Sequence, residues 1–226
     1  MSSALFAAVL ILALGLHLFH HARVTRGKAQ SGRTADRRAV TSVVPDAVDA
    51  SNGTAGVVTW TGTWKGRRVQ IRTIVDTLAT RKLPAFWLSV TIAEPVAIAG
   101  VLDIMMRPGS ATTFSNFDHF PHSIRTPGSF PDEAVVRSNR DVDFPLDIVA
   151  DHVGVLANGR AKELLITPNG VRIVWLMAEA DRARYGVFRQ AEFSGAGVNP
   201  AVIEDLLGRA AALRDALNAT SLRAAA

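Results

Sequence analysis

The stretch DHFPH, residues 118–122, is the place in the sequence where metal-binding residue types lie closest together. Two imidazoles three residues apart, next to a carboxylate, could hold zinc or iron if His152, Asp141 or Asp143 supplied a further ligand. Pro121 separates the histidines and disfavours a helix that would fix their spacing, so solvated loop side chains are the simpler interpretation. We therefore expect no metal, with only weak candidates in Asp118, His119 and His122.

Other chemistry-bearing residue types give still weaker signals. Asp141 and Asp143 are better placed to cap a following helix than to bind calcium, because no glycine-rich acidic loop surrounds them. Gly195 and Gly197 precede a helix but lack the strand and third glycine of a phosphate-binding turn. No nucleophile elbow, zinc-protease or kinase signature occurs, and cysteine is absent. We predict no catalytic residue, no cofactor and no enzymatic activity.

The amino terminus carries a long apolar run. It can be extended to about twenty residues, the length of a bilayer span, and no basic residue precedes it as in a secretion signal. We predict a transmembrane anchor over residues 1–22. The large apolar side chains expected to form it are Leu5, Phe6, Val9, Leu10, Ile11, Leu12, Leu14, Leu16, Leu18 and Phe19.

Basic residues follow this run directly. The chain has 25 Lys and Arg against 20 Asp and Glu, and the excess of +5 comes entirely from the first forty residues, so the rest is neutral. Retention of basic residues on the cytoplasmic side predicts a bacterial inner-membrane protein with its amino terminus outside and a cytoplasmic domain. The same side chains could contact anionic lipid headgroups, and we expect no nucleic-acid binding: Arg23, Arg26, Lys28, Arg33, Arg37 and Arg38.

Composition divides the remaining chain. We expect a basic flexible linker over 23–55, one α+β domain over 56–219 and a disordered tail over 220–226. The predicted fold class is therefore an N-terminal transmembrane helix followed by a mostly antiparallel β domain. One middle helix and one C-terminal helix complete it.

Alternating apolar residues predict the strands. Residues 57–76 indicate a hairpin with its turn at Gly66, and residues 85–92 and 98–106 indicate two further strands. A second hairpin is expected around Asn169-Gly170, and another strand over 185–193. The stretch 109–143 is expected to be loop.

Helical spacing predicts two helices. One begins near Pro145 with Asp143 as its cap and ends at Asn158-Gly159. The last is capped by Asn199, has Pro200 at its first position and presents a leucine-rich face to the sheet.

Trp87 alternates out of phase with its neighbours. Phe86, Leu88 and Val90 share one face of their strand, and Trp87 lies on the other. An aromatic side chain on the second sheet face is typical of a protein–protein contact, so Trp87 is a candidate partner surface.

The arrangement of these features resembles a set of bacterial single-pass membrane proteins with a β-rich cytoplasmic domain. The resemblance rests on the span and basic linker, Gly62-x-x-x-Gly66-Arg67, Arg137-Ser138-Asn139, the Asn169-Gly170 hairpin and the final helix. It implies the fold and the anchor, but no activity and no functional residue.

These observations predict a non-enzymatic accessory or scaffolding subunit. It would bind and stabilise a larger inner-membrane complex, whether respiratory, photosynthetic or transport, through other integral membrane subunits. Two alternatives stay open: a membrane-tethered metal-dependent enzyme built on residues 118–122, and a module that binds lipid or a small ligand at the cytoplasmic leaflet.

Overall fold

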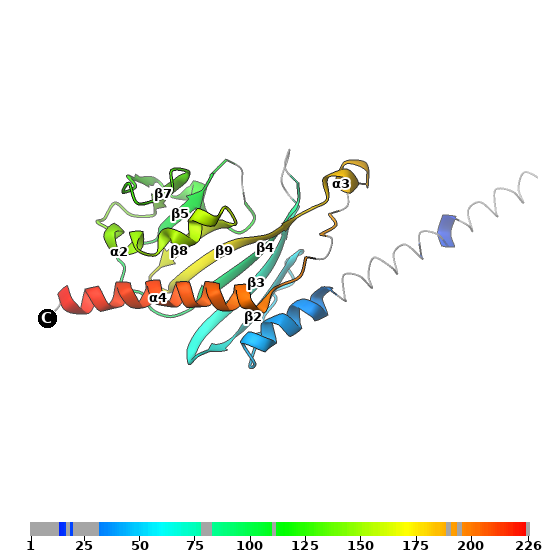
Figure 1. The fold of residues 1–226 in the computed structure, drawn as a ribbon, viewed down its shortest axis with the longest axis horizontal. Coiled ribbons are helices and arrows are strands. Elements are labelled where there is room, and N and C mark those ends of the chain that lie inside the picture. Colours follow the sequence, from blue (N-terminus) through cyan, green and yellow to red (C-terminus); the bar gives the residue numbers. More distant parts are fainter. Residues whose placement is uncertain are drawn as a thin grey trace, which may run out of the picture.

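The computed structural model describes residues 14–16, 19, 32–77, 83–109, 112–188, 191–193 and 196–224. It contains a nine-stranded antiparallel sheet in the order β1-β2-β3-β4-β9-β8-β5-β7-β6, with α4 lying across one face (Figure 1). The elements are β1 Val48–Asp49, β2 Val57–Trp64, β3 Arg67–Asp76, β4 Ala85–Ile92, β5 Leu102–Met106, η1 Phe117–His119, β6 His122–Ile124, β7 Ala134–Ser138, α2 Leu146–Ala150, η2 Val153–Asn158, β8 Ala161–Thr167, β9 Gly170–Glu179, α3 Arg182–Phe188 and α4 Pro200–Ala224.

Strand alternation divides the sheet into two faces. The first face, toward α4, carries Ile71, Leu88, Val90 and Ile173, all at most 1% exposed. It packs against one side of α4, whose buried residues are Ile203, Leu206, Leu207, Ala210, Leu213 and Leu217. The second face carries the intervening residues of the same strands, and a mixed polar and apolar set lies there.

The β2–β3 hairpin turns as its sequence predicts. Lys65 and Gly66 both have positive φ, 48° and 78°, which matches the two central residues of a type I′ turn. Trp64 and Arg67 pair directly across this turn. The two-residue turn therefore fixes the register that places Trp60 and Ile71 on the first face.

A helix over residues 32–43 lies beside β2, within the segment predicted as a linker. Val40 and Val44 are fully buried against the core, and the Asp36 carboxylate accepts a hydrogen bond from the Val198 amide at 3.1 Å. Gly62 lets this segment approach, because an added Cβ there would meet Val44 Cγ1 at 2.6 Å. The helix is part of the folded unit rather than a separate tether.

The predicted transmembrane helix requires correction. Among the residues that the structure describes, no helix combines the length and the apolar character needed to cross a membrane. This finding overturns the fold class with a transmembrane helix, the single-pass description and the inner-membrane location. The longest helix among the described residues, α4, has 25 residues, but it carries charged side chains such as Asp205 and Arg209. Leu14, Leu16 and Phe19 are described and exposed, and the other predicted anchor residues lie outside the described part.

Several boundaries also differ from prediction. Residues 182–188 form α3 instead of a strand, and residues 145–158 split into α2 and the 3-10 helix η2. The N-cap of α2 is Pro145 without a side-chain hydrogen bond, so Asp143 does not cap it. Gly159, at φ 77°, ends η2 in the left-handed conformation expected there. The stretch 109–143 includes η1, β6 and β7, because pairing with β5 outweighs its proline content.

Candidate functional site

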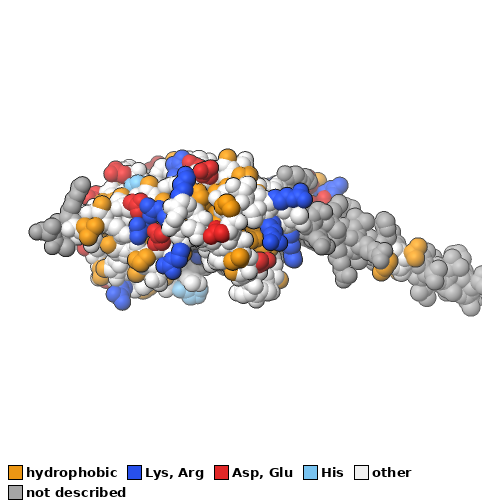
Figure 2. Space-filling view, turned by 90° about the horizontal axis from the view of Figure 1, so that it is seen from below, with side chains coloured by type: hydrophobic (Ala, Val, Ile, Leu, Met, Phe, Trp, Pro, Cys, Tyr) orange, Lys and Arg blue, Asp and Glu red, His pale blue; other side chains and the backbone are white. Residues whose placement is uncertain are grey.

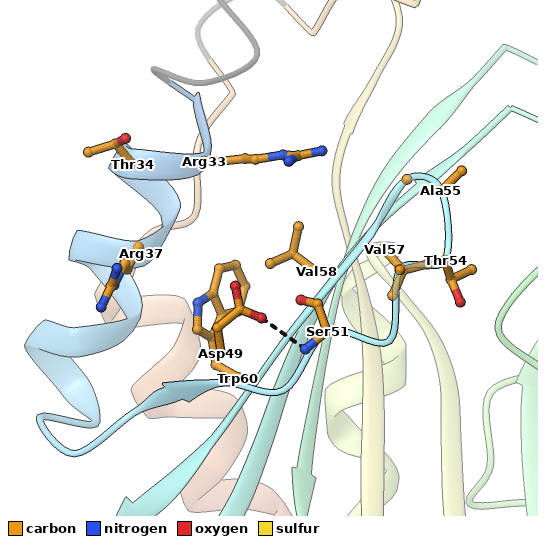
Figure 3. Close-up of a pocket in the computed structure, with 12 residues that line it drawn as sticks. Arg33, Thr34, Arg37, Asp49, Ser51, Thr54, Ala55, Val57, Val58 and Trp60 are labelled. Atoms are coloured by element: carbon orange, nitrogen blue, oxygen red, sulfur yellow. Dashed lines mark hydrogen bonds between the residues drawn. The ribbon is translucent and has the colours of Figure 1, made fainter.

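A cleft opens between the helix over 32–43 and the β1–β2 edge of the sheet (Figure 3). Its volume is about 510 Å³, and we call it the arginine cleft. Arg33 and Arg37 line it from the helix, where a spacing of four residues places them on one side. Thr34 lines it from the same helix. The other lining residues come from β1, β2 and the loop between them: Asp49, Ser51, Gly53, Thr54, Ala55, Gly56, Val57, Val58 and Trp60.

The β1–β2 loop has a fixed conformation. Gly53 and Gly56 both adopt positive φ, and the Gly56 carbonyl accepts a hydrogen bond from the Val75 amide at 2.8 Å. Ser51 Oγ accepts a hydrogen bond from the Thr59 amide at 3.0 Å. These bonds hold the loop against β2 and β3, so the wall of the cleft opposite the helix is built in advance of any ligand.

The floor of the cleft is apolar and its rim is charged. Trp60 is 3% exposed and Val58 is half-buried, whereas Arg33 and Arg37 are exposed. Asp49 accepts a hydrogen bond from the Ser51 amide at 2.8 Å. Hydrogen bonds from Ser51 hold the pKa of Asp49 below its ordinary value, and the charges of Arg37 and Arg33 act in the same direction. With Asp49 ionised, the rim carries one net positive charge.

The arginine cleft can bind an anion, but its side chains offer little for covalent chemistry. Two guanidinium groups supply charge and paired N–H donors suited to carboxylate or phosphate oxygens. Asp49 and Ser51 are already engaged with the backbone of the loop. No histidine or cysteine occurs among the described residues that line the cleft.

A second polar cluster lies on the second sheet face. Glu163 is fully buried, and its Oε2 accepts hydrogen bonds from Arg172 Nε at 3.1 Å and Nη2 at 2.7 Å. Asp103 is also fully buried, and its Oδ2 lies 3.4 Å from the Ser115 hydroxyl. Burial and the nearby charge of Glu163 raise the pKa of Asp103 to about 8. Asp103 is therefore protonated at neutral pH.

The loop that supplies Ser115 covers part of this face. The ring of Phe114 meets Trp87 edge-on with centroids 5.4 Å apart, and the two pack with Ile74 and Val174 as a separate apolar cluster. The Arg137 guanidinium lies 5.0 Å from the ring centroid of Phe117. This loop thus encloses the carboxyl groups beneath it.

The predicted metal candidates do not form a centre. Asp118 and His119 lie exposed in η1, and His122 begins β6. Within the described ranges, no three His, Cys, Asp or Glu side chains are arranged to hold a metal ion. Among the described residues, the metal-dependent alternative therefore has no ligand set.

Trp87 lies on the second face, as its alternation predicts. Phe114 packs on its ring and leaves it half-buried, so less of the indole is available than an open sheet face would offer. Its role as a partner surface stays a prediction. The indole Nε1 is buried without a hydrogen-bond partner.

The predicted lipid-contacting residues separate into three groups. Arg33 and Arg37 line the cleft, Arg38 is exposed on the same helix outside it, and three others lie outside the described residues: Arg23, Arg26 and Lys28. Sequence reasoning did not identify Asp103, Glu163 or Arg172 as a cluster. The only available signal was that each interrupts an apolar strand with a charge.

Comparisons with known proteins add a fold likeness. No protein-family model matches the chain, and no curated protein matches it in sequence. Among solved structures, the chain is similar to the crystal structure of the mycobacterial trehalose monomycolate transport factor A, TtfA. The identity is 14%, the TM-score is 0.44, and the match covers 82% of this chain and 93% of that chain. A likeness at this level transfers no site residue and no function.

Proposed function

We propose that this protein is a non-enzymatic accessory protein that binds an amphiphilic anion in the arginine cleft. The observation that carries the proposal is the pairing of Arg33 and Arg37 with an apolar floor at Val58 and Trp60. A ligand with a carboxylate or phosphate head on a short apolar body matches both parts of this surface.

The electrostatics favour an anion over a cation. Asp49 is the one carboxylate among the described lining residues, and its oxygen is hydrogen-bonded to the Ser51 amide. Arg33 and Arg37 remain exposed, so a ligand can reach them without breaking a buried ion pair. A hydrogen bond to a charged group contributes about 1.5–3 kcal/mol in favourable cases, and exposure reduces this value.

The experiment is calorimetric titration of the full chain with hexyl phosphate, inorganic phosphate and hexanol. We expect hexyl phosphate to bind more tightly than either fragment, because it fills both the charged rim and the apolar floor. Arg37→Gln should weaken this binding at least threefold. Arg38→Gln is the matched control, since it removes the same charge from the same helix outside the cleft.

Two results would contradict the proposal. Equal weakening by Arg37→Gln and Arg38→Gln would show that general charge, not the cleft, attracts the ligand. Equal binding of hexanol and hexyl phosphate would remove the arginines from recognition.

Membership of a larger protein assembly remains a prediction of the sequence. Native electrophoresis of the protein extracted from its own cells, followed by mass spectrometry of the band, tests it. Migration with defined partners at fixed stoichiometry would support an accessory subunit, and migration alone would contradict it.

A further inference from the structure

Four polar side chains form a compact patch on the second sheet face. Arg72 on β3 is the register partner of Ser89 on β4, and Thr91 on β4 is the register partner of Arg172 on β9. Because Ser89 and Thr91 are two residues apart on the strand between, both hydroxyls lie on the same face as the two guanidinium groups. We call these four residues the hydroxyl–arginine patch.

Two members of this patch have unmet hydrogen-bonding capacity. Ser89 is 1% exposed, and its Oγ has no hydrogen-bond partner. Arg72 is half-buried and takes part in none of the hydrogen bonds or ion pairs of the described part of the chain. A buried polar group without a hydrogen-bond partner is costly. A serine hydroxyl without a partner beside an unpaired arginine therefore indicates a missing hydrogen-bond acceptor.

The charges around the patch are also unbalanced. Arg172 is paired with Glu163, whereas Arg72 faces the like charge of Arg172. Burial and that like charge lower the pKa of Arg72. Asp103, a further buried acid of this face, is protonated at neutral pH and does not offset the second arginine. An anion bound between the two guanidinium groups would reduce the repulsion between them.

We propose that Arg72, Arg172, Ser89 and Thr91 bind a small oxyanion, a carboxylate or a phosphate group. Arg72 supplies the free guanidinium edge, and Arg172 adds its charge while keeping its bonds to Glu163. The two hydroxyls donate to oxygens of the anion from the strand between. The backbone register alone brings the four side chains together on one face.

This site is independent of the arginine cleft. The cleft is floored by Val58 and Trp60 of β2, and Trp60 is the register partner of Ile71, so that floor belongs to the first face. The hydroxyl–arginine patch lies on the second face of β3, β4 and β9. Loss of one site should therefore leave the other intact.

The test follows the arginine Nε–Hε signals of the full chain by NMR during titration with sodium phosphate or sodium acetate. Sodium chloride keeps the ionic strength constant. We expect saturable shifts of the Arg72 and Arg172 signals with at least one of the two anions. Tighter binding of phosphate or of acetate supports the site in either case and names the oxyanion class.

Variants make the assignment specific. Arg72→Gln should weaken binding at least fivefold, and Ser89→Ala should weaken it at least twofold while retaining every charge. Arg68→Gln is the matched control, because Arg68 is exposed on the same strand and the same face four residues away. Arg37→Gln, which affects the cleft, should leave these shifts unchanged.

The proposal is overturned if the shifts grow linearly without saturation for both anions. It is equally overturned if Arg68→Gln weakens binding as much as Arg72→Gln, because the effect is then general charge. An unchanged affinity in Ser89→Ala, with the variant folded as judged by its NMR spectrum, would remove the buried hydroxyl from the site.

Discussion

Asp103 and Glu163 lie on neighbouring strands of the same sheet face, both fully buried, and each has one carboxyl oxygen without a hydrogen-bond partner. Two ionised carboxylates cannot share such a site cheaply, and burial together with the charge of Glu163 raises the pKa of Asp103. The pair makes stability depend on pH.

Asp103→Asn should change that dependence. The pKa of Asp103 is about 8 in the folded state and near 3.8 in the unfolded chain, so the folded state binds more protons between these values. The contribution of Asp103 to the free energy of unfolding of the wild-type protein therefore falls as pH rises from about 4 to about 8. Urea unfolding across that range should show that the free energy of unfolding of the variant rises relative to that of wild type, by at most about 1.4 kcal/mol per pH unit. A difference that stays constant over the range would contradict this assignment, and Asp118→Asn on the exposed η1 is the control.

Arg172→Met should destabilise the fold by about 3–5 kcal/mol, because it leaves the buried Glu163 carboxylate without its two hydrogen bonds. Replacing both members, Glu163→Leu with Arg172→Met, should recover most of this loss. Chemical denaturation of the three proteins checks the cycle. A double variant as unstable as the single one would mean that the ion pair itself, rather than the unpaired charge, supplies the stability.

Gly62→Ala should lower both the stability of the fold and the affinity of the arginine cleft for its ligand. Its Cβ would meet Val44 Cγ1 at 2.6 Å and Asp46 Oδ1 at 2.8 Å, so the end of the helix over 32–43 must move away from β2. We expect a loss of about 1–3 kcal/mol by overpacking and weaker hexyl phosphate binding. Gly208→Ala on α4, where an added Cβ meets no atom within 4 Å, should keep the binding and gain up to about 1 kcal/mol.

Phe114→Ala should expose the part of the second face that Phe114 covers, including the ring of Trp87. Phe114 is 7% exposed and packs on Trp87, Ile74 and Val174, so its loss should cost about 3–5 kcal/mol. The Trp87 indole N–H should then exchange with solvent faster, which NMR measures directly. Unchanged exchange in a destabilised variant would show that the loop does not shield this ring.

Parts of the fold follow from local sequence. The positive φ of Lys65 and Gly66 realises the predicted hairpin turn, and the Asn199 side chain accepts a hydrogen bond from the Ala201 amide at the start of α4, as a cap should. Alternation placed Asp103 opposite Ile104 and Trp87 opposite Leu88. The strand expected over residues 185–193 was wrong where α3 covers residues 185–188, because the apolar spacing fits both periods and tertiary packing decides between them. The anchor was predicted from hydropathy alone, and the described helices provide none.

What the sequence by itself determined is therefore local: turns, caps, strand faces and the balance of charge after residue 40. Figure 2 shows basic, acidic and apolar side chains interspersed on one side of the molecule, in keeping with that balance. What only the tertiary structure decided is which residues meet. Arg72 and Arg172 lie one hundred residues apart in sequence, and Arg33 lies far from Val58. The order of strands in the sheet brings the first pair together, and packing of the helix over 32–43 on the sheet brings the second. Both follow from burying one common core rather than from any short stretch of chain.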